Sequence, residues 1–277
     1  MDESILRHLS AADAVLGGVI RAVGPSRPES LDDCPPFQAL AQAIAHQQLN
    51  GKAANTILER LVQQCGQGQF PTPEMVLACS RARLRAAGFS FAKVAALKDL
   101  AKKTLAAVVP DEATLRQLPD EEIIARLTQV RGIGRWTVEM LLIFRLGRPD
   151  VLPVDDFGVR NGFRAAYGLA RLPRPQALAA WGERWKPYRS TAAWYLWRAL
   201  ELERAGTLPA PAERVRLPRV RKARRRRSSA PIAAGPTRRL RKLRSGGASS
   251  APPRRSGGRT GARRLRARRS RAPESQR

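Results

Sequence analysis

The sequence predicts an all-α fold, and three observations support this. Apolar residues such as Leu40, Ile44, Ile57 and Leu61 recur at helical spacings. Short turns at Gly or Pro separate such segments, and long runs of strand-like alternation are absent from the sequence. Hydrophobic residues make up 43% of the 277 residues, which is enough to build a substantial core.

The first predicted helical region runs from Phe37 to Leu61. Its apolar spacing is interrupted by the polar run at 46–51 (HQQLNG), so the region is either two helices or one helix with a functional break. The same spacing, with turns at Gly88, Pro110 and Pro119, predicts further helices over 73–78, 84–87, 93–105 and 120–127.

The sharpest local feature lies at 127–137, where Gly132 and Gly134 stand two positions apart. One helix is predicted to end near Val130 and the next to start near Trp136, giving a helix-hairpin-helix over about 121–145. Glycines allow positive φ and close approach, so N–H groups at the start of the second helix can meet a phosphate. A simple glycine-capped turn is the alternative, which two glycines alone do not exclude.

A Pro-rich loop at 149–157 follows and leads into another helix, whose inward face is read from Val159, Phe163, Ala166 and Tyr167. Asp155 is predicted to be the N-cap of this helix, which leaves Asp156 in its first turn. A carboxylate there experiences the positive end of the helix dipole and is expected to stay ionised. Two capping residues without chemistry are the alternative, and the local pattern by itself favours it.

Positive charge is concentrated at the C-terminal end. Residues 209–277 hold 24 of the 51 basic and 2 of the 23 acidic residues, so they carry 22 of the 28 net positive charges. This segment is too poor in apolar residues to fold alone, which predicts a disordered Arg-rich tail after a helical domain at 1–208. Nucleic acid is the expected partner because binding would release condensed counterions, although a solvated extension or a localisation signal is possible.

Several other classes of protein are disfavoured by the sequence. It has no apolar stretch of about 20 residues, and residues 1–4 lack the features of a signal peptide, so we expect an intracellular protein, cytoplasmic and nucleoid-associated if bacterial. Three cysteines far apart and two histidines cannot form a zinc motif or a four-cysteine iron–sulfur cluster. No required cofactor is therefore expected.

The order of helix, Gly-Ile-Gly hairpin, apolar helix, Pro-rich loop and Asp resembles the helix-hairpin-helix (HhH-GPD) DNA glycosylase superfamily. Within it, the sequence is most similar to the 3-methyladenine DNA glycosylase II group. Residues 183–198 resemble that group's C-terminal helices, 45–50 its DNA-wedging segment and 88–90 a recurring turn. The resemblance covers most of residues 1–205 and implies a two-lobed helical fold in the short, helix-only form.

The resemblance also implies an activity. It indicates a monofunctional DNA glycosylase that flips alkylated purines such as 3-methyladenine out of double-stranded DNA, hydrolyses the N-glycosidic bond and acts as a monomer in base excision repair. The endonuclease III branch has a Schiff-base lysine where this chain has Trp136, so lyase activity is not expected. The alternatives are a non-enzymatic DNA-binding protein and a glycosylase for other damaged or mismatched bases.

Site residues follow from the same resemblance. Asp156 is the expected catalytic carboxylate and Asp155 a structural residue. Trp136 and Trp197 match pocket aromatics of the family, and Phe157 stands where some members have tyrosine. Trp181, Trp185 and Trp194 are instead assigned to the core.

The resemblance also implies which residues contact the DNA and which could hold a cation. Gln48 or Asn50 is expected to fill the gap left by the extruded base, unless these amides only cap the helix break. The hairpin is expected to contact DNA through Gly132, Gly134, Arg135 and Thr137. The backbone carbonyls of Thr128, Val130 and Gly132 match positions that hold a monovalent cation in the family.

Overall fold

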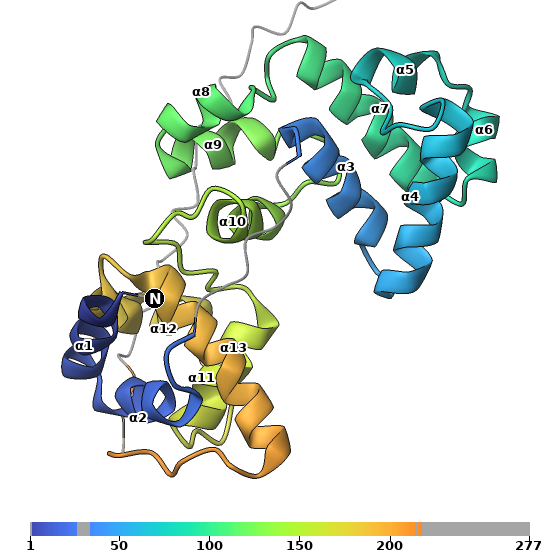
Figure 1. Ribbon diagram of the computed structural model, residues 1–277. Coiled ribbons are helices and arrows are strands. Elements are labelled where there is room, and N and C mark those ends of the chain that lie inside the picture. The colour runs from blue at the N-terminus through green and yellow to red at the C-terminus, as the bar shows by residue number, and fades with distance from the viewer. Residues whose placement is uncertain (1, 27–33, 214, 216, 218–277) are drawn as a thin grey trace, which may run out of the picture. The chain divides into compact units, whose positions relative to one another are not determined.

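The computed structural model describes residues 2–26, 34–213, 215 and 217 (Figure 1). The helices found in these residues, with one short 3₁₀ turn, η1, and no strand among them, confirm the all-α prediction. In chain order the elements are α1 (Glu3–Ala12), α2 (Ala14–Val23), α3 (Pro36–His46), α4 (Gly51–Cys65), α5 (Pro73–Ala78), α6 (Arg81–Ala86), α7 (Phe91–Leu105), α8 (Glu112–Gln117), α9 (Asp120–Leu127), α10 (Arg135–Phe144), α11 (Phe157–Ala166), α12 (Pro175–Gly182), η1 (Glu183–Trp185) and α13 (Arg189–Ala205).

The predicted region from Phe37 to Leu61 consists of two helices, α3 and α4, which confirms the first of the two alternatives. Asn50 starts α4 because its side-chain oxygen accepts a hydrogen bond from Ala53 N at 2.8 Å. Ser90 caps α7 in the same way through Lys93 N, so α7 begins two residues earlier than predicted. Helices α1, α2, α8 and α12 were not predicted from the sequence.

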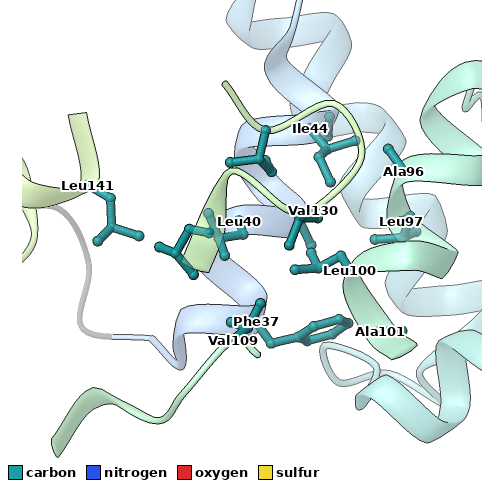
Figure 2. Close-up of a cluster of buried hydrophobic side chains, with 14 of the residues drawn as sticks. Phe37, Leu40, Ile44, Ala96, Leu97, Leu100, Ala101, Val109, Val130 and Leu141 are labelled. Carbon is teal, nitrogen blue, oxygen red and sulfur yellow. The ribbon is translucent and has the colours of Figure 1, made fainter. Parts of the chain in front are cut away.

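Two hydrophobic clusters organise the described chain. The first is built only from residues between Phe37 and Val151, and so from α3 to α10 and the segments that join them. Figure 2 shows its central part, where Phe37, Leu40 and Ile44 of α3 lie near Leu97 and Leu100 of α7. Burial of these side chains holds the hairpin in place, because Val130 and Ile133 of the hairpin are part of the same cluster.

The second cluster combines the two ends of the described chain. It joins residues of α1 and α2 to residues of α11, α12, η1 and α13, with Trp185, Tyr195 and Phe163 among its largest buried side chains. Trp181 and Trp185 belong to this core and Trp194 packs against it, which confirms that assignment. Trp197 packs against both clusters.

A buried carboxylate lies inside the second cluster. Asp13, only 3% exposed, caps α2 by accepting from Leu16 N through Oδ1. Its Oδ2 accepts hydrogen bonds from Tyr167 Oη at 2.5 Å, Trp181 Nε1 at 2.9 Å and Trp185 Nε1 at 3.0 Å. Asp13 therefore links the N-terminal helices to three aromatic side chains more than 150 residues away in sequence.

The described chain continues past the predicted domain boundary at residue 208. Val215 and Leu217 are partly buried and pack against the second cluster. The Arg-rich runs of the predicted tail, from residue 218 onward, lie outside the described residues.

Two other features complete the fold. Cys65 at the end of α4 and Cys79 after α5 form a disulfide, which the sequence analysis did not predict. Among the described helices, none has both the length and the apolar character that crossing a membrane requires.

Candidate active site

The hairpin between α9 and α10 has the geometry that its glycines predict. Gly132 has φ of +80°, a conformation that side-chain-bearing residues rarely adopt. Gly134 is the N-cap of α10, and because it has no side chain, it leaves the first N–H groups of the helix accessible to an anion. Asp99 of α7 supports the hairpin by accepting from Arg131 N at 2.7 Å.

The loop between α3 and α4 is tied to this hairpin. Gln47 Nε2 donates to the carbonyl of Gly132 at 2.7 Å. Lys93 Nζ of α7 donates to the carbonyls of Ala45 and Gln47 at 2.9 and 2.7 Å, and partial burial lowers the pKa of this lysine. Gln47 and Lys93 were not predicted as supports of the site, because such long-range contacts leave no local pattern in the sequence.

A cavity of about 580 Å³ opens between α3, the α3–α4 loop and α10. Its walls are mainly apolar and include Trp136, with polar side chains contributed by the loop and by Thr137 and Arg145 at the two ends of α10. The lining residues are Ala39, Leu40, Ala43, His46, Gln47, Gln48, Gly132, Trp136, Thr137, Met140, Leu141 and Arg145. A cavity of this size and character is typical of a site for a small, largely apolar group.

Asp156 stands beside Trp136 and is itself the N-cap of α11. Its Oδ1 accepts from Val159 N at 2.6 Å, which is the capping bond. The prediction that Asp155 caps this helix and Asp156 lies in the first turn is therefore wrong by one residue. Asp155 is exposed and precedes the cap.

Both predicted pocket tryptophans donate to Asp156. Trp136 Nε1 donates to Oδ2 at 2.7 Å and Trp197 Nε1 donates to Oδ1 at 2.9 Å. An ionised carboxylate accepts about four hydrogen bonds, and three are made here. One acceptor position remains, and it is on Oδ2, the oxygen that Trp136 contacts.

Of the other predicted site residues, only some line the cavity. Gln48 lines the cavity with φ of +57°, whereas Asn50 serves as the cap of α4, as the alternative for these amides stated. Phe157 is 66% exposed and does not line the cavity, although it directly follows Asp156. Thr137 lines the cavity.

Arg135, a predicted DNA contact, is held by two carboxylates. Its guanidinium pairs with Glu121 at 2.6 Å and Glu139 at 2.9 Å, and these bonds raise its pKa further above the usual value. Burial raises the pKa of Glu139, although the bond to Arg135 opposes this. The side chain is still half-exposed, so it can be reached from solvent.

Comparison with known proteins decides the family. The model of the HhH-GPD superfamily base excision DNA repair proteins matches residues 41–187, which is more than half of the chain. The chain belongs to the HhH-GPD superfamily. The matched range includes the hairpin, the cavity-lining residues after position 41, and Asp156, while Trp197 lies beyond it.

Relatives within the HhH-GPD superfamily share most of their length with this chain. DNA-3-methyladenine glycosylase 1 of Schizosaccharomyces pombe is 43% identical over 196 residues, which cover 70% of this chain and 86% of that protein. The solved structure of the Schizosaccharomyces pombe 3-methyladenine DNA glycosylase in complex with abasic DNA has a TM-score of 0.63 at 42% identity, covering 70% and 95% of the two chains. A DNA-3-methyladenine glycosidase from Bacillus halodurans has a TM-score of 0.66 at 32% identity, covering 73% and 91%.

The carbonyls that the sequence resemblance predicts at a monovalent-cation site are partly engaged. Gly132 O accepts from Gln47 Nε2, and Val130 O accepts from Ile133 N at 3.0 Å. Each carbonyl oxygen has two lone pairs, so both keep one that can face a cation. Neutral carbonyl oxygens suit a hard cation, and the donor set of Thr128, Val130 and Gly132 is compatible with one.

Gly158, which was not predicted, allows Trp197 to approach the carboxylate. A Cβ at this position would lie 2.8 Å from Trp197 Cδ1, 2.9 Å from its Nε1 and 3.0 Å from Asp156 Oδ1. Such distances are too short for real contacts, so any side chain would displace the indole. Trp197 is otherwise held by stacking on Phe144 at 5.5 Å between ring centroids.

We expect Gly158→Ala to slow base release by roughly 10- to 100-fold, which corresponds to losing one hydrogen bond to a charged group. The single-turnover rate should fall while affinity for undamaged DNA stays near the wild-type value. Gly18→Ala is the control, since a Cβ at this α2 position meets nothing closer than Arg21 Nη2 at 4.0 Å. Equal single-turnover rates for the two variants would show that Gly158 does not position Trp197.

Proposed function

We propose that this protein is a monofunctional DNA glycosylase that releases alkylated purines, such as 3-methyladenine, from double-stranded DNA in base excision repair, acting as a monomer. One observation carries the proposal: the carboxylate of Asp156 accepts from the indoles of Trp136 and Trp197, next to an apolar cavity. The relatives named above, which are 3-methyladenine glycosylases, support the choice of substrate.

The cavity suits a flipped, cationic base. A purine alkylated at N3 or N7 carries positive charge, which an aromatic face attracts, and Trp136 offers its indole to the cavity. The walls formed by Leu40, Met140 and Leu141 provide apolar contact to the faces of the base. Such a site selects for charge and shape, so we propose that several alkylated purines are accepted.

The chemistry then needs only one carboxylate. As the glycosidic bond breaks, the sugar becomes oxocarbenium-like, and the negative charge of Asp156 stabilises it. The remaining acceptor position on Oδ2 can orient a water toward the anomeric carbon. A cationic base leaves readily, so no strong general acid is required.

We assign the filling of the vacated base position to Gln48. It lines the cavity from a strained loop conformation, whereas the side chain of Asn50 is used to cap α4. At the hairpin, the carbonyls of Thr128, Val130 and Gly132 would hold a monovalent cation that bridges to a DNA phosphate. These two assignments concern binding and take no part in bond cleavage.

The experiment is to incubate the full chain with methylated duplex DNA, identify the released bases, and assay the DNA strand for breaks. We expect release of methylated purines and an intact abasic site that breaks only after alkali treatment. Borohydride should trap no covalent adduct, because Trp136 stands where lyases of this superfamily carry lysine. A trapped adduct would contradict the monofunctional mechanism, and DNA binding without base release would favour the non-enzymatic alternative.

A further inference from the structure

A second cavity, of about 480 Å³, lies along α7 and reaches Arg131 of the hairpin. Four basic side chains line it, from α6, α7 and the hairpin: Arg81, Lys98, Lys102 and Arg131. The remaining lining residues are Phe91, Val94, Ala95 and Asp99. We call this cavity the basic hollow.

The charge of the basic hollow is not neutralised from within. Its one acidic residue, Asp99, already accepts from Lys103 Nζ and from Arg131 N, both at 2.7 Å. Although partial burial opposes it, these bonds lower the pKa of Asp99. In the described part of the chain no carboxylate forms an ion pair with Arg81, Lys102 or the Arg131 guanidinium, whereas Arg135, Arg148, Arg164 and Arg189 are all paired.

Three of the four cations also act on one another. Burial lowers the pKa of Lys98, and the charges of Arg81 and Lys102 lower it further. Lys98 Nζ donates to the carbonyls of Leu77 and Cys79, which fixes this charge at the wall of the hollow. An anion in the hollow would relieve the repulsion between these cations, so the site is complementary to negative charge.

Position identifies which anion. Arg131 directly precedes Gly132 of the hairpin, whose accessible N–H groups are arranged for a DNA phosphate. The hollow therefore shares Arg131 with the hairpin, which places its cations next to a strand whose phosphate the hairpin holds. Several phosphates along one strand can offset four cations more fully than one isolated small anion does.

We propose that the basic hollow binds the phosphate backbone of the DNA strand next to the segment held by the hairpin. This inference rests on the proposed function only in that the hairpin contacts DNA. The hollow would extend the protein's contact along the strand and add affinity without reading the lesion, because phosphates carry no base identity.

The test compares two double variants of the full chain. Lys102→Gln with Arg131→Gln removes two charges from the hollow and leaves the Asp99 contact to the backbone of Arg131 intact. Arg171→Gln with Arg204→Gln is the matched control, because both of these residues are exposed and neither lines the hollow. Binding to an undamaged duplex is measured by fluorescence anisotropy over a range of salt concentrations.

We expect the slope of log K against log salt concentration to become shallower by about 0.9 for each phosphate that is no longer neutralised, and by about 1.8 if each of the two side chains neutralises one. The control should keep the wild-type slope, and base release by both variants at saturating protein should proceed at the wild-type rate. Equal slopes for the two double variants would overturn the proposal. Binding to polyglutamate is measured for the same proteins. If the Lys102/Arg131 variant binds polyglutamate more weakly than the control does, while its DNA slope is unchanged, the proposal is overturned and the hollow instead binds an acidic polypeptide.

The two proposals fail in different ways. If the wild-type protein releases no base, the proposed function is wrong, but the change in salt slope still tests the hollow. If bases are released and the slopes are equal, only the hollow is wrong.

Discussion

Asp156→Asn is expected to reduce release of methylated purines by roughly 10³-fold or more, because the neutral amide cannot stabilise a cationic sugar or orient the water as a carboxylate does. Asparagine caps helices as well as aspartate does, so the bond from Val159 N to the side chain survives and α11 keeps its start. Single-turnover base release, DNA affinity and the thermal unfolding midpoint should be measured together. Only the first of these should change strongly.

Asp155→Asn is the matched control, since it removes the same charge from the adjacent, exposed position. Its base-release rate should stay within a few-fold of wild type. Release by a folded Asp156→Asn protein at a rate close to that of the control would remove Asp156 from the catalytic role.

Asp13→Asn is expected to lower the free energy of unfolding by at least about 3 kcal/mol. Asparagine has an NH₂ group in place of the carboxylate oxygen that accepts from Tyr167, Trp181 and Trp185. These buried donors would lose their acceptor, and each unsatisfied donor costs about 1–3 kcal/mol of stability. Burial and the adjacent Asp13 charge raise the pKa of Tyr167 well above its usual value, so its hydroxyl remains a donor. Urea unfolding followed by circular dichroism measures the change.

Asp2→Asn separates capping from the aromatic network. Asp2 caps α1 through Ser4 N, as Asp13 caps α2, but it is exposed and has no aromatic donors in the described structure. Because asparagine is an equally good cap, this variant should unfold within about 0.5 kcal/mol of wild type. A similar small loss for Asp13→Asn would show that the buried network contributes little to stability.

Features encoded by neighbouring residues were predictable from the sequence. The hairpin follows from Gly132 and Gly134, and the α3–α4 break from its polar run, because backbone requirements at a turn leave a local signature. The resemblance to the superfamily predicts Asp156 as the catalytic carboxylate, and in the structure Trp136 and Trp197 both donate to it. The choice of cap failed because Asp155 and Asp156 satisfy the same local pattern, and only the path of the preceding loop decides between them.

Long-range contacts were not predictable in this way. Gln47 and Gly132 are 85 residues apart, and Trp197 and Asp156 are 41 apart, so no periodicity relates them. The disulfide between Cys65 and Cys79 depends on how α4 and α5 pack. The importance of Gly158 cannot be read from the sequence. Glycine is needed there because Trp197 occupies the space that a side chain would fill.

The composition of the two hydrophobic clusters has a consequence for synthesis on the ribosome. The first cluster is continuous in sequence, from Phe37 to Val151, and can form as soon as that stretch has emerged. The second needs Leu6 to Ile20 together with partners as late as Ala199. The apolar faces of α1 and α2 emerge first and find their partners last, so during translation they are the surfaces most in need of protection by a chaperone.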